Sequence, residues 1–356
     1  GSRGLHQMLW EIVDNAIDEA ANGYASRIDV CLYADGSISV EDNGRGIPVG
    51  IHPEMHISGV ELVFSKLHAG GKFNNDNYAY SGGLHGVGAS VVNALSEWLR
   101  VEVFRDGHVY EQEYHSFAEG GKMHAGVPKY PLREVGETAK HGTRVTYLAD
   151  AQVFDDIQVQ FDRVSRRLRE LAFLVKGVTI RLRDEREAQP RELAFCYMGG
   201  IVDFLTDMNQ DKTPLHPAPI HFSGERNGIL AEVAMQYVDS DKEYLYSYVN
   251  NISTGEGGTH ETGFKVALTK VMNEYMKTVS AAVKEKLTFE GEDYREGLSA
   301  ILSVKMKEVQ FEGQTKTRLG NPEARVAVEA IVSEGLSQFL QDLGNASVAS
   351  RIAEKA

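Results

Sequence analysis

Helical and strand-like hydrophobic patterns follow one another irregularly in this chain, and this mixture is the feature that most constrains its fold. Residues 5–22 carry apolar side chains at the spacing of a helix that ends at Asn22-Gly23. Residues 27–33 and 37–42 alternate as two strands, and Asp35-Gly36 between them is a typical hairpin turn. Because strands and helices are mixed and do not alternate strictly, the sequence predicts an α+β fold and not a doubly wound parallel sheet.

The same patterns continue through the rest of the chain. They predict helices over 57–68, 89–98, 161–173, 260–279, 322–341 and 346–356, and strands over 99–148 and at 178–182, 229–237, 244–250 and 298–304. A length of 356 residues suits two domains at about 150 residues each. The pattern restarts after Gln189-Pro190, so we expect one domain over residues 1–190 and a second, smaller one over 191–356.

Charge and cysteine content exclude several classes of protein. The formal net charge of −14 argues against wrapping DNA by bulk electrostatics, because neutralising phosphates requires clustered Lys and Arg. The 2 cysteines, Cys31 and Cys196, are too few for a disulfide framework and favour a reducing compartment. No apolar run reaches the roughly twenty residues needed to span a bilayer. We therefore expect a cytoplasmic protein with no membrane partner.

Glu11 and Asn15 are the first candidate site residues. They lie four positions apart on the polar side of the first predicted helix, so both side chains can reach one ligand. A carboxylate there can accept a proton from water, and an amide oxygen can bind a hard cation such as Mg²⁺. The alternative is a solvated polar face made of Glu11, Asp14, Asn15, Asp18 and Glu19.

A second candidate follows a predicted strand, where Asp42 precedes a turn that contains Gly44 and Gly46. The glycines would let a flat ring approach the backbone, and the Asp42 carboxylate could accept a hydrogen bond from an exocyclic amine. An ordinary turn, for which Asn-Gly and Gly are typical, is the alternative.

A glycine-rich stretch, residues 82–88, runs directly into the helix predicted at 89–98. Successive glycines expose backbone N–H groups, and a helix N-terminus adds partial positive charge, so this stretch could bind phosphates. It is not a Walker P-loop, because no Lys-Ser/Thr follows the glycines. It is not a Rossmann fingerprint either, since a loop and not a strand precedes it.

In this order, ExxxN on a helix, DxGxG after a strand and a glycine loop before a helix resemble the ATPase family of gyrase, heat-shock chaperones, sensor histidine kinases and mismatch-repair proteins. Longer segments look like the B subunit of bacterial DNA gyrase, with its relative, the E subunit of topoisomerase IV, second. These segments span nearly the whole chain: residues 67–73 (LHAGGKF), 81–95 (SGGLHGVGASVVNAL), 257–260 (GGTH), 294–298 (YREGL) and 312–317 (EGQTKT). The resemblance implies a GHKL-type (Bergerat) ATP-binding α/β sandwich followed by a smaller α/β transducer domain with a ribosomal-protein-like fold.

The resemblance also implies roles for single residues in the first domain. Glu11 matches the general base for the water that attacks the γ-phosphate, and Asn15 matches the Mg²⁺ ligand. Asp42 matches the residue that accepts the adenine amino group, which excludes GTP because guanine presents a carbonyl there. Other matches to the nucleotide pocket are Gly44, Gly46, Ile47 and Thr143, and those to the pocket edge where aminocoumarin inhibitors bind are Arg45, Pro48 and Arg105.

A lid over the nucleotide and a contact from the second domain are implied in the same way. The residues that match the lid are Lys72, Tyr78, Gly83, Leu84, His85, Gly86, Val87 and Gly88. Gln314 and Lys316 match the loop that reaches the γ-phosphate, where a cation that loses its contact on hydrolysis can report the nucleotide state. For Lys316 the alternative is a solvated side chain in a polar loop.

Two positions depart from the family pattern. Gln7 stands where the family usually has a His one turn before the catalytic Glu, and it can hydrogen-bond Glu11 but cannot carry the charge of a Glu–His dyad. Ala79 follows the lid Tyr78 where a Lys is common, which predicts weaker nucleotide binding.

The resemblance thus implies the ATP-binding and ATP-hydrolysing region of a type IIA topoisomerase, with ATP and Mg²⁺ as cofactors. The expected partners are a captured DNA duplex, the gyrase A subunit, a second copy in an ATP-dependent dimer and aminocoumarin-type inhibitors. A patterned helix begins directly after Gly1-Ser2, so we expect the dimerising arm to lie upstream of this fragment, and slow hydrolysis without it. A nucleotide-switched chaperone, a mismatch-repair ATPase and a catalytically silent nucleotide-binding module are the alternatives.

Overall fold

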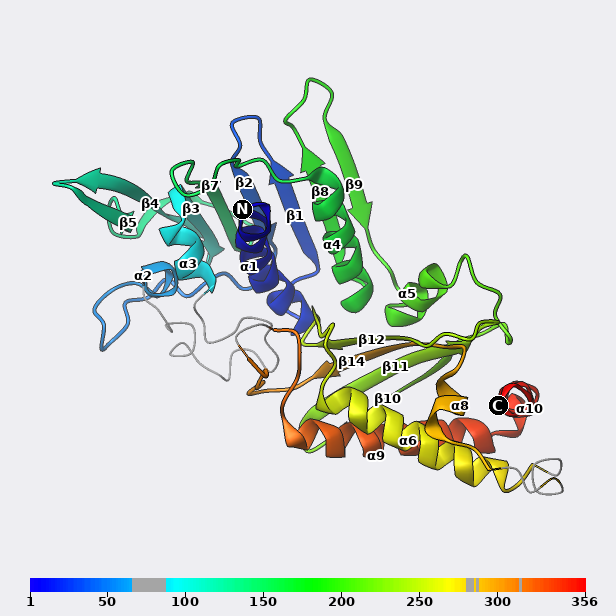
Figure 1. Cartoon of the computed structure of the whole chain (residues 1–356). Helices are drawn as coiled ribbons and strands as arrows, with labels where there is room; N and C mark the ends of the chain where they lie inside the picture. Colours follow the sequence, from blue (N-terminus) through cyan, green and yellow to red (C-terminus); the bar gives the residue numbers. More distant parts are fainter. Residues whose placement is uncertain (66–87, 280–284, 286–287, 314–315) are drawn as a thin grey trace. The chain divides into compact units, whose positions relative to one another are not determined.

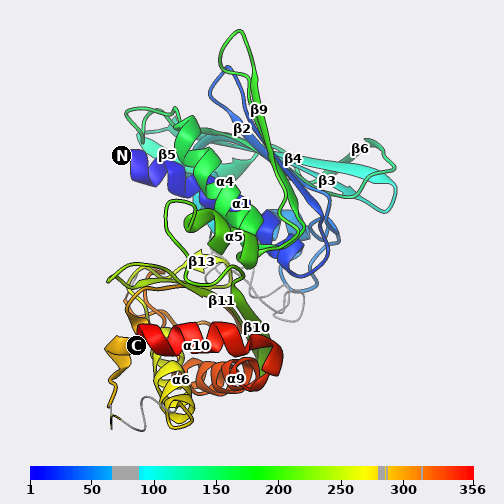
Figure 2. The same cartoon turned by 90° about the vertical axis from the view of Figure 1, so that its right-hand side faces the viewer.

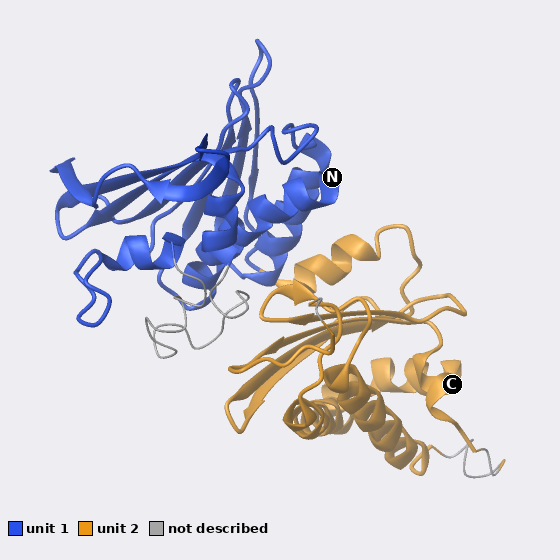
Figure 3. Ribbon diagram, turned by 60° about the vertical axis from the view of Figure 1, so that its left-hand side comes forward, with its two compact units in different colours: residues 1–198 blue, residues 199–356 orange. Residues whose placement is uncertain are grey.

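The chain divides into two compact units, Gly1–Met198 and Gly199–Ala356 (Figure 3). The structure, a computed structural model, describes residues 1–65, 88–279, 285, 288–313 and 316–356. Each unit contains one β-sheet with helices packed against it. This mixed architecture confirms the predicted α+β fold class.

The sheet of the first unit has the strand order β5-β4-β3-β7-β2-β1-β8-β9, and β6 pairs with β4. All neighbouring strands are antiparallel except β1 and β8, which are parallel. The strands are β1 (Arg27–Leu32), β2 (Ile38–Asp42), β3 (Ser96–Arg105), β4 (His108–Glu119), β5 (Lys122–Pro128), β6 (Arg133–Glu137), β7 (Gly142–Ala149), β8 (Thr179–Asp184) and β9 (Arg191–Phe195).

Helices cover one face of this sheet. They are α1 (Ser2–Ala21), α2 (Gly59–Ser65), α3 (Gly88–Ala94) and α4 (Phe161–Leu174), and Figures 1 and 2 show α1 and α4 on the same face. The apolar side of α1 is buried as its periodicity predicts, and Leu9 and Val13 are inaccessible to solvent. Because α1 contacts β2, where Val40 is buried, the alternate residues of β2 that share its face point toward this helix.

The sheet of the second unit has the strand order β10-β11-β14-β12-β13. Its strands are β10 (Ile220–Arg226), β11 (Ile229–Tyr237), β12 (Tyr244–Val249), β13 (Ile252–Ser253) and β14 (Leu298–Lys305). Helices α6 (Thr259–Met276) and α9 (Pro322–Gln341) pack side by side on one face, and α5 (Ile201–Met208) lies on the other (Figure 1). The smaller helices are α8 (Gly291–Arg295), η2 (Leu343–Asn345) and α10 (Ala346–Lys355).

Buried apolar side chains form the core of this second unit. Phe264 and Leu268 of α6 and Val328 of α9 are inaccessible to solvent within it. In the ranges that the structure describes, no helix is long and apolar enough to cross a membrane.

Two predicted helices in the first unit have different limits. The one expected at 89–98 ends at Ala94, and β3 begins at Ser96. Local helix propensity is overridden there because β3 pairs with both β4 and β7. The one expected at 57–68 is α2, whose described part ends at Ser65.

The expected domain boundary after Pro190 lies inside the first unit. β9 begins at Arg191 and pairs with β8, so this hairpin extends the first sheet before the unit ends at Met198. The residues of β9 are mostly exposed, and the strand therefore lacks the alternation of apolar side chains that sequence reasoning uses. Helix α5 and strand β10 were also not predicted.

Candidate functional site

Asp42 and Thr143 face each other across the central strands of the first sheet. Asp42 is the last residue of β2 and pairs directly with Thr143 of β7, which pairs in turn with Val103 of β3. Residues directly opposite each other in antiparallel strands share a face of the sheet. Because Val40, two positions before Asp42, is buried, this row lies on the face that the helices cover.

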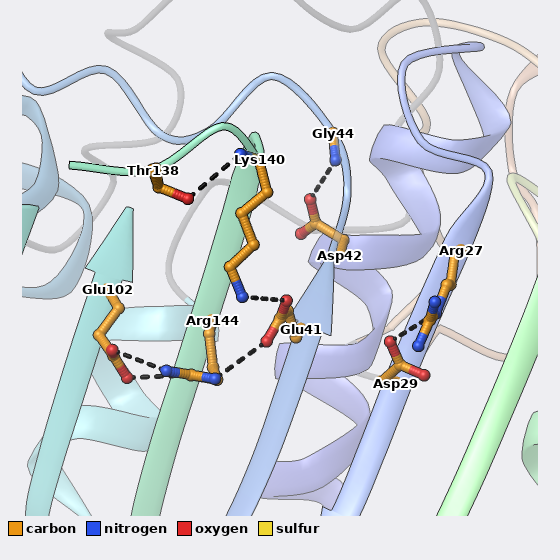
Figure 4. Close-up of polar contacts among 9 residues, drawn as sticks. All are labelled: Arg27, Asp29, Glu41, Asp42, Gly44, Glu102, Thr138, Lys140 and Arg144. Atoms are coloured by element: carbon orange, nitrogen blue, oxygen red, sulfur yellow. Dashed lines mark hydrogen bonds and ion pairs between the residues drawn. The ribbon is translucent and has the colours of Figure 1, made fainter. Parts of the chain in front are cut away.

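The neighbouring row, on the opposite face, consists of charges that pair across the same strands (Figure 4). The Arg144 guanidinium lies 2.8 Å from a Glu102 oxygen and 3.2 Å from a Glu41 oxygen, and Lys140 Nζ lies 3.2 Å from Glu41. Burial alone would raise the pKa of Glu102, but the hydrogen bond and charge of Arg144 hold it below its ordinary value. These pairs link β2, β7 and β3 next to Asp42.

The turn that follows Asp42 is held by side-chain hydrogen bonds. Asp42 Oδ1 accepts the Gly44 N–H at 2.8 Å (Figure 4), and Thr143 Oγ1 accepts the Ile47 N–H at 3.1 Å. The carboxylate and the hydroxyl of the row therefore also fix the path of the turn.

Two glycines bring this turn close to the neighbouring backbone. Gly46 has a φ of 84°, and Gly142 has a φ of 131°, both in the region that favours glycine. A Cβ on Gly142 would lie 1.9 Å from the Asp42 carbonyl oxygen. Arg105 Nη1 donates to the Gly46 carbonyl at 2.8 Å, so one predicted pocket-edge residue, Arg105, contacts this turn.

Glu19 of α1 ties the same turn to the helix. Its carboxylate accepts the Arg45 backbone N–H at 2.9 Å and the Arg45 guanidinium at 3.0 and 3.1 Å. The Arg45 guanidinium also lies over the Tyr24 ring, 3.6 Å from its centroid. A Cβ on Gly44 would lie 2.2 Å from Glu19 Cγ. The ion pair, with Glu19 buried, therefore sets the distance between α1 and the Asp42 turn.

Glu11 lies on α1 about two turns before Glu19. Gln7 Nε2 donates to Glu11 Oε1 at 3.0 Å, as expected from the spacing. A Cβ on Gly88, the first residue of α3, would lie 2.2 Å from Glu11 Oε2, so the described start of α3 lies against this carboxylate. Asn15, one turn further along α1, is exposed.

The alternative interpretation of this helix as a solvated polar face is wrong for three of its residues. Asp14, Asp18 and Glu19 are buried. Glu11 is half-buried and Asn15 is exposed, so these two keep access to a ligand.

Asp42 has an unusual protonation equilibrium. Burial raises the pKa of Asp42 to about 7, the hydrogen bond from Gly44 opposes this shift, and the charge of Glu19 adds to it. The Asp42 carboxyl group therefore changes between its neutral and charged forms near pH 7. A charged carboxylate only accepts hydrogen bonds, whereas the neutral acid can also donate one.

The described residues contain no group of three or more His, Cys, Asp or Glu side chains that could hold a metal ion. Mg²⁺ does not require such a group, because it keeps several waters and usually takes one or two protein oxygens beside those of substrate phosphates. The exposed Asn15 amide, next to Glu11, fits a cation that arrives with a phosphorylated ligand.

Several predicted site residues lie outside the described ranges. They are Lys72, Tyr78, Gly83, Leu84, His85, Gly86, Val87 and Gln314. Lys316 is described in the second unit, where it is half-buried.

Known proteins match both units. The family model described as "Histidine kinase-, DNA gyrase B-, and HSP90-like ATPase" matches residues 1–152, and the one described as "DNA gyrase B" matches residues 200–356. The crystal structure of the 43K ATPase domain of Thermus thermophilus gyrase B in complex with an aminocoumarin has a TM-score of 0.81 and 37% identity, covering 100% of this chain and 89% of that one. The chain belongs to the family of gyrase B and topoisomerase IV B subunits.

Members of both branches of this family are similarly close to the chain. The DNA gyrase B subunit of Halalkalibacterium halodurans is 48% identical over 99% of this chain, and the topoisomerase 4 B subunit of Streptococcus pneumoniae is also 48% identical over 99%. The topoisomerase IV ATP-binding domain of Francisella tularensis, in complex with a small-molecule inhibitor, has a TM-score of 0.79 and 32% identity, covering 99% of this chain and 92% of that one. These similarities do not separate gyrase from topoisomerase IV.

The chain spans about half the length of the curated family members it matches, 54% and 53% for the first two. Its two units correspond to the ATPase region of the family, and the GHKL-type fold is the one that the resemblance implied.

Sequence reasoning missed the structural roles of Glu19, His141 and Gly142. A ring nitrogen of His141 lies 2.7 Å from the Gly44 carbonyl oxygen, which adds a further attachment of the turn. A signal for Glu19 was present, because it continues the four-residue spacing of Glu11 and Asn15 on α1. His141 and Gly142 carried no such signal, since their contacts depend on the pairing of β7 with β2.

Proposed function

We propose that the first unit binds ATP together with Mg²⁺ and hydrolyses the terminal phosphate. The observation that carries this proposal is the Glu19–Arg45 pair, which joins the Asp42 turn to the helix that bears Glu11 and Asn15. This pair holds Asp42, which can recognise a nucleotide base, at a fixed distance from α1. Glu11 and Asn15 on α1 can act at the phosphates.

Asp42 and Thr143 recognise the adenine ring. The charged Asp42 carboxylate accepts a hydrogen bond from the exocyclic amine, and the Thr143 hydroxyl lies beside it in the same row. Gly44, Gly46 and Ile47 line the turn where the ring approaches the backbone. Guanine places a carbonyl oxygen opposite the carboxylate, which leaves two acceptors facing each other.

Glu11 acts as the general base for the attacking water. The hydrogen bond from Gln7 fixes its carboxylate, and Gly88 at the start of α3 lies close to the same carboxylate. Asn15 is the Mg²⁺ ligand. The bound cation would neutralise negative charge on the phosphate oxygens.

The remaining contacts with the nucleotide come from two other places. Lys72, Tyr78 and residues 83–88 match the family's nucleotide lid, and on that resemblance we propose that they bind the phosphates, although all but Gly88 lie outside the described residues. On the same resemblance we propose that Lys316, with Gln314, which lies outside the described residues, binds the γ-phosphate.

In the whole protein, this ATPase region operates a gate for a DNA duplex in a cytoplasmic type II topoisomerase. The family relationship supports this proposal, and the protein partners are a second copy of this chain and, in gyrase, the A subunit. Gyrase and topoisomerase IV are both candidates. Negative supercoiling by the reconstituted complex identifies gyrase, and decatenation without supercoiling identifies topoisomerase IV.

Aminocoumarins are the inhibitor class that fits the pocket edge. The Thermus thermophilus relative was solved in complex with one. Here Arg45, Pro48 and Arg105 occupy the edge of the same turn, and Arg105 is already held by the Gly46 carbonyl.

Thermal unfolding tests the nucleotide proposal without relying on turnover. In Mg²⁺, a non-hydrolysable ATP analogue at about a hundred times its dissociation constant should stabilise the protein by roughly 2.7 kcal/mol. We expect a rise in Tm with this analogue and little change with its guanine counterpart. Equal shifts with both would contradict the role of Asp42, and no shift with either would contradict nucleotide binding.

A further inference from the structure

Lys316 is followed directly by a segment that is hydrogen-bonded on both of its sides. We name residues 317–319 the return segment. On one side, the Glu312 N–H donates to the Arg318 carbonyl at 2.8 Å. This bond joins the described residues on either side of Lys316, which lies two positions before Arg318.

On its other side the return segment lies against residues 254–260, which connect β13 to α6 and which we name the cradle loop. The Glu256 N–H donates to the Thr317 carbonyl at 2.9 Å, and the Leu319 N–H donates to the Gly257 carbonyl at 3.1 Å. The two segments thus form an isolated parallel β-bridge, between Gly258 and Leu319, outside the main sheet.

Glu256 adds two contacts that involve side chains. Thr317 Oγ1 donates to Glu256 Oε2 at 2.6 Å, and Arg318 Nη1 donates to the Glu256 carbonyl at 2.8 Å. Glu256 is exposed and Thr317 only half-buried, so these bonds are not required to satisfy groups in a core. They fix the position of the residue that comes immediately after Lys316.

The cradle loop is itself attached firmly to the second unit. Gly258 has a φ of 140°, and a Cβ there would lie 2.4 Å from the Leu319 carbonyl oxygen, so only glycine permits this close approach. The buried His260 ring contacts Thr254 Oγ1 at 2.8 Å, and this hydroxyl in turn donates to the Ser247 carbonyl on β12 at 3.0 Å. The cradle loop, which holds the return segment, is therefore hydrogen-bonded to β12 and to the start of α6.

We infer that the cradle loop positions Lys316 for ATP turnover, with Glu256 and Thr317 as positioning residues. The inference rests on the proposed contact of Lys316 with the γ-phosphate. A lysine on an unsupported turn would lose conformational freedom each time it engaged the phosphate. Fixing Thr317 beforehand reduces that loss, so the cradle loop should act on the rate of the chemical step and on signalling to α6, and not on the affinity for nucleotide.

Thr317→Val tests this inference, because valine keeps the shape of threonine and removes the hydroxyl that binds Glu256. We expect kcat for ATP to fall about 5-fold, with KM, affinity for the non-hydrolysable analogue and Tm nearly unchanged. Thr317→Ser keeps the hydroxyl and should restore most of the rate. Thr278→Val is the matched control. Thr278 lies just after α6, and its hydroxyl donates to the Tyr275 carbonyl, so its removal should leave kcat unchanged.

A double-mutant cycle with Lys316→Ala decides whether the cradle loop acts through Lys316. If it does, Thr317→Val causes no further loss in the Lys316→Ala background. An equal fold loss in both backgrounds would overturn the inference, as would a wild-type rate for Thr317→Val when Lys316→Ala is slow. A wild-type rate for Lys316→Ala would instead refute the proposed contact of Lys316 with ATP, and the cradle inference with it.

Discussion

Glu11→Gln is expected to lower ATP turnover by about 100-fold or more while leaving nucleotide binding nearly intact, because general-base catalysis typically contributes a factor of 10²–10⁴. Glutamine has almost the same shape but cannot accept a proton from water. The carboxylate is half-buried and is held by Gln7 Nε2 at 3.0 Å, so its orientation is fixed before ligand binds. Single-turnover hydrolysis and analogue-dependent Tm shifts would measure the two effects separately.

Glu97→Gln is the matched control for this substitution. Glu97 is an exposed residue of β3 in the same unit, and its replacement should alter neither turnover nor binding. Turnover by Glu11→Gln at the wild-type rate would exclude Glu11 as the base. A binding-competent protein without turnover, wild type included, would favour a catalytically silent module.

Gln7 determines how far this site can follow the family's Glu–His arrangement. It supplies a hydrogen bond to Glu11 but no charge, so Gln7→Ala should have a much smaller effect than Glu11→Gln. Gln7→His restores the residue that the family usually has at this position. It should raise turnover at a pH near about 6.5, the ordinary pKa of histidine, because the imidazole can then share a proton with Glu11.

Much of the fold followed from local patterns. The first helix and the hairpin after it were predicted nearly to their ends, because α1 has an apolar period and Asp35-Gly36 makes a short turn. β9 was not predicted because most of its residues are exposed. The start of β3 was predicted three residues too late, at 99, because Ser96 and Glu97 continue the helical pattern that precedes them. Pairing with distant strands, and not local propensity, decides both cases.

The candidate site was predictable only in part for a similar reason. Spacing along one helix brings Glu11 and Asn15 together, so sequence alone could place them. The pairs Glu19–Arg45 and His141–Gly44 join residues 26 and 97 positions apart, and no local pattern specifies such contacts. The buried state of Asp14 and Asp18 was likewise invisible, since polar residues normally predict a solvated face.

Asp42→Asn should weaken nucleotide binding and increase the stability of the folded protein. We expect affinity for the adenine nucleotide to fall by about 100-fold, since a charge-assisted hydrogen bond is lost. The asparagine oxygen can still accept the Gly44 N–H that Asp42 Oδ1 accepts now, which turns its NH₂ group toward the ligand. Two donors then face each other when adenine is bound, whereas guanine offers an acceptor, so selectivity should shift toward the guanine nucleotide.

The stability gain follows from the proton equilibrium of Asp42. Burial raises its pKa to about 7 in the folded protein, whereas an unfolded Asp titrates near 4. Between these values the folded state binds the extra proton, so this group's contribution to stability is complete below about pH 4 and is lost as the pH rises through about 7. Asparagine has no such loss. About three pKa units correspond to about 4 kcal/mol at pH 8, and this value is the upper limit of the variant's gain in stability without ligand.

Thermal unfolding from pH 5 to pH 8, without nucleotide, measures this difference directly. The variant's advantage in Tm should grow with pH and level off above about 7. The same titration in wild type should change nucleotide choice, because the neutral acid can donate to a guanine carbonyl and the charged carboxylate cannot. Discrimination between adenine and guanine analogues should therefore be weak near pH 6 and strong near pH 8. Discrimination that does not vary with pH would show that Asp42 stays charged throughout this range.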